Sequence, residues 1–65
     1  MKMHEYRVVN ERTELGLKIN ALQGIIGCTD YQSLPAEDQN LLVIQLEAMR
    51  KYHHILALRI ERFAP

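Results

Sequence analysis

Apolar residues recur at heptad spacing in the first half of this 65-residue chain, and this pattern restricts the possible fold more than any other feature. The positions are Val8, Leu15, Ile19, Leu22 and Ile26, with steps of seven, four, three and four. Steps of three and four place side chains along one stripe of an α-helix, the stripe that packs against a neighbouring helix. The spacing predicts a helix over about residues 3–26, with Arg12 at the one stripe position that is not apolar.

A second heptad stripe follows in the other half of the chain. Pro35 suits the first turn of a helix, and Glu37 and Asp38 suit its positive end. These signals predict a second helix over about residues 35–63. Its predicted stripe, with steps of three and four, consists of Leu42, Gln45, Met49, Tyr52, Leu56, Arg59 and Phe63.

The short segment between the helices, residues 27–34, makes them antiparallel neighbours. Gly27 suits a left-handed helix cap, and Thr29 or Asp30 could begin a single helical turn. The expected fold is therefore an all-α, antiparallel two-helix hairpin that forms one domain over residues 1–65, with Leu15 near Tyr52.

A chain of this length builds only a marginal core and is usually supported by disulfides, a metal ion or a partner subunit. Cys28 is the single cysteine, and no Cys/His spacing resembles a zinc site. Self-association remains, and helix two carries more large apolar residues than one neighbouring helix can cover. We expect a homo-oligomer whose interface comprises Leu41, Ile44, Ala48, Ile55 and Leu58.

No residues point to catalysis, a metal site or a cofactor. His53 and His54 are adjacent, so on a helix they point about 100° apart and cannot hold one metal ion together. Cys28 has no histidine nearby that could activate it. The formal net charge is zero, which disfavours nucleic-acid binding. The longest apolar run, from Leu41 to Ile44, is too short to cross a membrane. We expect a non-enzymatic, soluble, cytoplasmic protein.

Two arginines, Arg12 and Arg59, interrupt the predicted stripes, and a guanidinium is costly to desolvate without a partner. One interpretation is an ion pair with Glu5, Glu11 or Glu61. The other is an anion site, because the planar guanidinium binds phosphate or carboxylate through two hydrogen bonds. Tyr52 would then be either part of the core or a stacking surface, and Tyr6-Arg7 offers a similar aromatic and cationic pair.

The chain also resembles a family of very small tailed-phage proteins related to a protein of crAss-like phages. The residues that carry the resemblance in helix one and the turn are Arg7-Val8, Glu11, Leu15, Lys18-Ile19, Leu22, Ile26, Tyr31, Leu34-Pro35 and Gln39. Those in helix two are Leu42, Gln45, Ala48-Met49, Tyr52, Leu56, Arg59-Ile60 and Phe63. The resemblance implies an accessory protein that acts in the cytoplasm of an infected bacterium. Its architecture is similar to that of phage anti-defence sponges, which bind nucleotide signals of bacterial immunity.

Two functional hypotheses follow. In the first, an oligomer sequesters a cyclic oligonucleotide or a cyclic ADP-ribose type of second messenger. Its ligand-binding residues would be Arg7, Arg12, Tyr52 and Arg59. In the second, the apolar face of helix two binds a host defence or replication protein as a helix in a groove.

Overall fold

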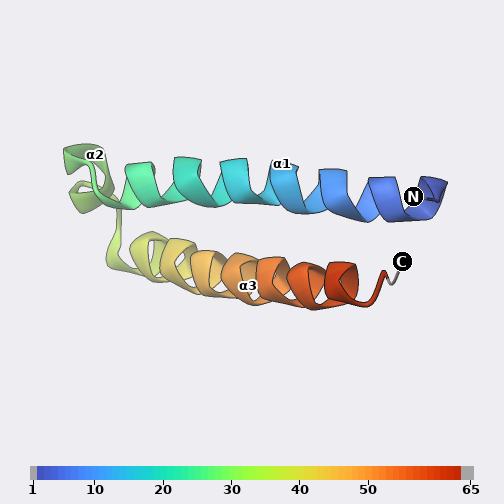
Figure 1. The fold of residues 1–65 in the computed structure, drawn as a ribbon. Coiled ribbons are helices and arrows are strands. Elements are labelled where there is room, and N and C mark those ends of the chain that lie inside the picture. Colours follow the sequence, from blue (N-terminus) through green and yellow to red (C-terminus); the bar gives the residue numbers. More distant parts are fainter. Residues whose placement is uncertain (1, 64–65) are drawn as a thin grey trace.

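Two long antiparallel helices make up most of the molecule. The computed structural model describes residues 2–63, with α1 (Met3–Ile26), α2 (Thr29–Gln32) and α3 (Ala36–Glu61) in chain order. Helices α1 and α3 lie side by side, and the short α2 lies at the end where they are joined (Figure 1). The result is a rod of 49 × 15 × 13 Å. The predicted all-α class with two long helices is confirmed.

Local signals explain where the helices begin and end. At the start of α1, the backbone N–H of Lys2 donates to Oε1 of Glu5 at 2.8 Å, so this carboxylate caps the helix. Pro35 precedes α3, and the acidic Glu37 and Asp38 lie in its first turn. Helix α3 ends at Glu61, two residues before the end of the range predicted from the spacing.

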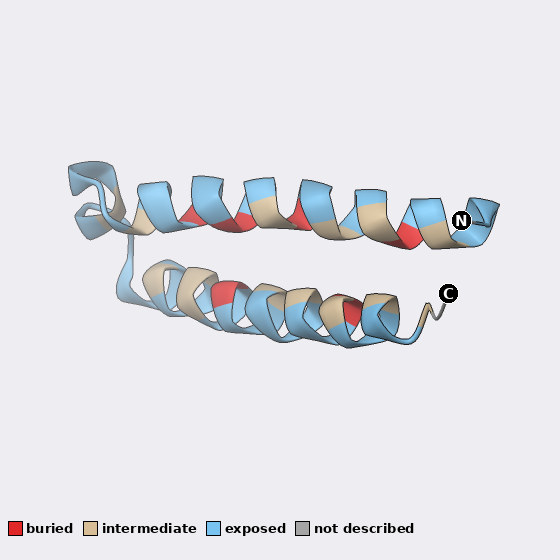
Figure 2. Ribbon diagram, viewed as in Figure 1, coloured by how far each residue is buried: buried red, intermediate tan, exposed pale blue. Residues whose placement is uncertain are grey.

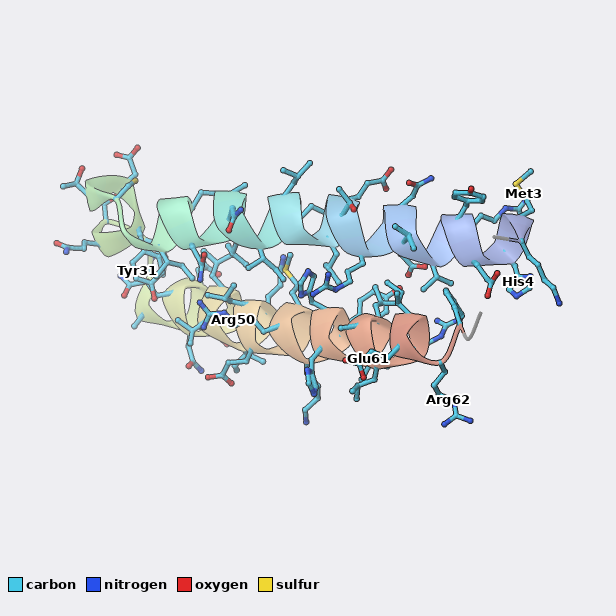
Figure 3. All side chains as sticks on the ribbon, viewed as in Figure 1. Met3, His4, Tyr31, Arg50, Glu61 and Arg62 are labelled. Atoms are coloured by element: carbon cyan, nitrogen blue, oxygen red, sulfur yellow. The ribbon has the colours of Figure 1, made fainter. Side chains whose placement is uncertain are left out.

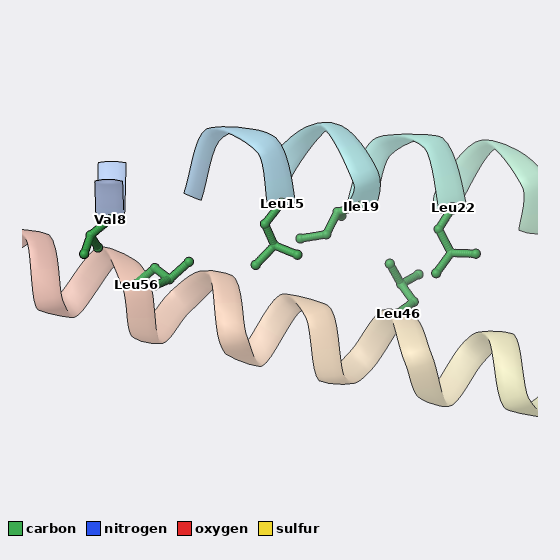
Figure 4. Close-up of a cluster of buried hydrophobic side chains, with 6 residues drawn as sticks. All are labelled: Val8, Leu15, Ile19, Leu22, Leu46 and Leu56. Carbon is green, nitrogen blue, oxygen red and sulfur yellow. The ribbon is translucent and has the colours of Figure 1, made fainter. Parts of the chain in front are cut away.

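The core is a single seam between α1 and α3 (Figures 2 and 4). Helix α1 contributes its heptad residues, and Leu56 of α3 is fully buried, with 0% of its surface exposed. The buried side chains are Val8, Leu15, Ile19, Leu22, Leu46 and Leu56. The apolar side chains that are partly buried against them are Ile26, Leu42, Met49, Ile60 and Phe63.

The predicted stripe of α3 was wrong at every second position. Gln45, Tyr52 and Arg59 are exposed, and their places in the seam are taken by Leu46, His53 and Ile60. Both sets alternate with the shared positions 42, 49, 56 and 63 in steps of three and four, so spacing alone does not distinguish them. The observed set removes Leu46 and Ile60 from water in place of Gln45 and Arg59, which is the larger gain in free energy.

Two contacts fix how the helices lie along each other. The rings of His4 and Phe63 pack edge to face, with centroids 6.3 Å apart. Farther along the rod, the imidazole of His53 packs against Gly16, so closely that a Cβ added to this glycine would lie 3.4 Å from Nε2 of His53. This register places Arg12 at the level of Leu56. Leu15 and Tyr52 therefore lie at the same level along the rod, as predicted, but Tyr52 is exposed and does not belong to the seam.

Hydrogen bonds hold the turn closed. The hydroxyl of Tyr31 donates to the carbonyl oxygen of Gln39 at 3.1 Å. The side-chain amide of Gln39 donates to the carbonyl oxygens of Leu34 at 2.9 Å and of Gln32 at 3.2 Å. Gly27 follows α1 but has a φ of −82°, so the predicted left-handed cap was wrong.

Candidate functional site

Arg12 is the polar residue of the α1 stripe, and the structure leaves part of it unsatisfied. Its side chain is half-buried in the seam, and its Nε atom is buried without a hydrogen-bond partner among residues 2–63. Of the three predicted carboxylate partners, Glu5 accepts the capping bond from Lys2. A buried N–H without an acceptor costs about 1–3 kcal/mol. Because Nε is shielded from solvent, an acceptor from outside this chain could satisfy it only if the Arg12 side chain turned outward.

Arg7 and Arg12 do not form one site within a single copy. They are five residues apart on α1, so their side chains are turned from each other by roughly 140°. Arg7 is exposed, whereas Arg12 lies in the seam. A ligand that touches both would have to wrap around α1.

Tyr52 and Arg59 share one exposed face of α3. They are seven residues apart, which is two helical turns, or about 10 Å along the axis. Tyr52 is 41% exposed and Arg59 is exposed, so neither belongs to the core. The interpretation of Tyr52 as a core residue was therefore wrong, and its ring is free to stack on a ligand within this copy.

His53 is a polar residue of the seam that is absent from the predicted stripe of α3. It is half-buried, and its imidazole lies against Gly16 of α1. A signal for this contact was present, because glycine inside a helix costs about 1 kcal/mol relative to alanine, and a closely packed neighbour explains why it is used. Gly24, the other glycine inside α1, has no such neighbour within 4 Å.

The side of α3 that faces away from α1 is largely exposed (Figure 2), and it carries several large apolar side chains. Four leucine and isoleucine side chains are about half exposed: Leu41 57%, Ile44 51%, Ile55 48% and Leu58 46%. Ala48 lies among them and is also exposed. We call these five residues the outer stripe.

Three features of residues 2–63 restrict the chemistry. The described part of the hairpin encloses no pocket, so a small ligand would need walls from more than one copy. Within the same residues, His, Cys, Asp and Glu side chains nowhere gather in threes that could bind a metal ion. None of the helices in this range has an apolar stretch long enough to cross a bilayer.

Comparison with known proteins gives two matches. The model of the family described as Sequestin matches residues 2–62. A protein of Enterobacteria phage T4, the uncharacterized 7.5 kDa protein in the denB-rIIB intergenic region, is 35% identical over 63 residues. That alignment covers 97% of this chain and 98% of the phage protein. No solved structure matches the chain.

Proposed function

Because this chain belongs to the Sequestin family and is similar to a small protein of a phage, we propose that it sequesters a nucleotide-derived second messenger of bacterial immunity. The family match over residues 2–62 is the observation that carries the sequestration, because it spans nearly the whole hairpin. The protein would act without catalysis, in the cytoplasm of the infected bacterium, as an anti-defence protein.

Arg12 supports an anionic ligand, because its Nε has no partner among residues 2–63 and its guanidinium would gain hydrogen bonds by turning outward to an anion. A phosphate oxygen is a strong acceptor for a guanidinium, and the bond gains strength where water is excluded. Arg7 and Arg59 would add positive charge from the exposed surface, and Tyr52 would stack on a base. Cyclic oligonucleotides and cyclic ADP-ribose isomers combine these two recognition elements, a phosphate and a purine.

Self-association is part of the proposal. Arg7 and Arg12 diverge on α1, and one hairpin encloses no pocket. Further copies of the hairpin would supply the missing walls, and equivalent arginines from several copies could converge on one ligand. The exposed apolar side chains of α3 support this association.

Calorimetric titration of the purified protein tests the ligand. Cyclic dinucleotides, cyclic trinucleotides and cyclic ADP-ribose isomers are added in turn, and at least one is expected to bind with a stoichiometry below one per chain. Arg12→Met should weaken binding by about tenfold or more, since a charge-assisted hydrogen bond contributes about 1.5–3 kcal/mol. Arg50→Gln is the matched control, because it removes an exposed arginine outside the proposed site. Absence of heat with every ligand would reject the nucleotide.

The outer stripe also supports the second hypothesis, a protein inhibitor. In that case the stripe binds a groove of a host defence or replication protein. A pull-down from host lysate would then recover one stoichiometric partner, and Ile44→Glu would abolish its capture while the helicity is retained. Capture that survives Ile44→Glu would reject this hypothesis.

A further inference from the structure

The outer stripe has a heptad spacing of its own. Lys51 fills the position between Ala48 and Ile55, and Arg62 is the next position after Leu58. With these two residues the spacing is a regular alternation of three and four: Leu41, Ile44, Ala48, Lys51, Ile55, Leu58 and Arg62. By the rotation of about 100° per residue, this stripe lies roughly opposite the seam that packs on α1. Figure 3 agrees, because Arg62 projects from the side of α3 that faces away from α1. Helix α3 therefore carries two heptad faces, and only one of them has a partner within the chain.

We propose that a second copy of the chain packs on the outer stripe with its α3 antiparallel, about a two-fold axis at the level of residues 49–50. This inference rests on the self-association in the proposed function and is independent of the nucleotide ligand. In this register Leu41 faces Leu58 of the second copy, and Ile44 faces its Ile55. Ala48 faces Lys51 of the second copy, whose aliphatic stem can cover the small side chain.

The apolar residues fit this arrangement because the stripe reads similarly in both directions. Leucine pairs with leucine and isoleucine with isoleucine at equal distances from the axis. A two-fold interface uses the same patch on both copies, so such a patch must complement itself when it is reversed. This symmetry favours a second copy over an unrelated protein, whose groove would impose no such relation on the two ends of α3.

The charges select the same orientation. Antiparallel pairing places Glu37 at the level of Arg62 of the second copy and Glu47 beside its His54. Parallel pairing would place each Arg62 against Arg62, whereas antiparallel pairing puts these two arginines at opposite ends of the interface. Like charges that face each other disfavour a helix pair, and opposite charges fix its orientation and register.

The arrangement has a consequence for the ligand site. Helix α3 would be covered on both faces, by α1 of its own chain and by α3 of the second copy. Asp38 of the second copy comes to the level of Arg59, so a phosphate that reaches Arg59 competes with this carboxylate. Arg12 lies on α1, away from this junction, and keeps its unsatisfied Nε.

Disulfide trapping tests the register. In a Cys28→Ser background, proteins with Ile44→Cys and Ile55→Cys are mixed and oxidised under mild conditions. The expected product is a disulfide between residues 44 and 55 of different copies. Two copies of residue 44 would be about 16 Å apart along the axis, whereas a disulfide requires Cα atoms within about 7 Å. Leu17→Cys, on an exposed position of α1, is the control that should not cross-link.

The possible outcomes distinguish a failure of the proposed antiparallel dimer from a failure of the proposed ligand binding. Disulfides formed mainly between identical positions would overturn the antiparallel register and leave the ligand hypothesis intact. Light scattering on the unsubstituted chain covers the case in which the cysteine variants fail to fold: a monomer at every concentration would overturn the pairing and the self-association together. Glu37→Arg and Arg62→Glu should each weaken the dimer several-fold, and the double variant should recover it. A double variant that dimerises as weakly as either single variant would also contradict the proposed pairing of Glu37 with Arg62.

Discussion

The two faces of α3 have the same spacing but different surroundings. Its inner face holds Leu46 and Leu56, both buried against α1. Its outer face holds Leu41, Ile44, Ile55 and Leu58, about half of whose surface faces solvent. Both sets follow the heptad rule. Heptad spacing therefore marks a face that can pack on a helix, but it does not say whether that helix belongs to the same chain.

The largest expected effect comes from Leu56→Ala on the inner face. Leu56 is fully buried, and truncation of a buried leucine costs about 2–5 kcal/mol. Urea denaturation followed by circular dichroism measures the loss. Leu58→Ala, two residues farther along the helix, is the matched control and should cost much less in dilute solution. Equal losses for the two variants would contradict the difference between the faces.

On the outer face, the largest expected effect is on association. Ile44→Glu places a charge in the outer stripe, where burial of an apolar side chain is worth about 1.5–3 kcal/mol. The dimer should dissociate at least tenfold more readily, measured by sedimentation or light scattering. The helical circular dichroism signal of the variant should remain, since Ile44 does not belong to the seam. Loss of the helical signal would show that the hairpin itself needs this face.

Arg12→Met tests whether the one polar residue of the α1 stripe lowers the stability of the seam. Because Nε of Arg12 is buried without a partner, an apolar chain of similar length should raise the free energy of unfolding by about 1 kcal/mol. The same variant should lose affinity for the ligand, a trade of function for stability. Arg12→Lys retains a charge and is the control that should not gain stability. A destabilised Arg12→Met would indicate that the guanidinium already has a favourable environment.

The smallest expected effects concern the two glycines inside α1. Gly24→Ala should raise the free energy of unfolding by about 1 kcal/mol, because no atom lies within 4 Å of the added Cβ and alanine is the better helix former. Gly16→Ala should gain less, since its Cβ would meet the imidazole of His53 at 3.4 Å. Thermal unfolding of both variants gives the difference. A larger gain at Gly16 would contradict the packing described for His53.

Much of the fold could be predicted from spacing and from turn chemistry. The α1 stripe was unambiguous because only one choice of heptad positions, which we call a frame, places its apolar residues on one side of the helix. The α3 stripe was not, because Gln45, Tyr52 and Arg59 fit the heptad as well as Leu46, His53 and Ile60 do. Only the comparison of buried apolar surface separates the two frames, and that comparison requires both helices in place.

The candidate site was predictable in part. Arg12 was recognisable because it interrupts an otherwise apolar stripe, and the structure shows its Nε to be unsatisfied. Arg59 was assigned to the seam on the same reasoning but is exposed, since it belonged to the wrong frame. The hydrogen bonds of Gln39 with Tyr31, Gln32 and Leu34 were not foreseen, because they depend on how the segment between the long helices lies against the first turn of α3.

The hydrogen-bonded turn at one end has a consequence for how the hairpin forms and opens. Contacts beside the turn close a short loop, whereas the contact of His4 with Phe63 joins nearly the full length of the chain and loses more entropy on closure. The two helices should zip from Tyr31 outward and fray from the free ends inward. Amide hydrogens around Leu22 would then exchange more slowly than those around Val8, and a break in the turn would disrupt the hairpin more than removal of a residue at either terminus.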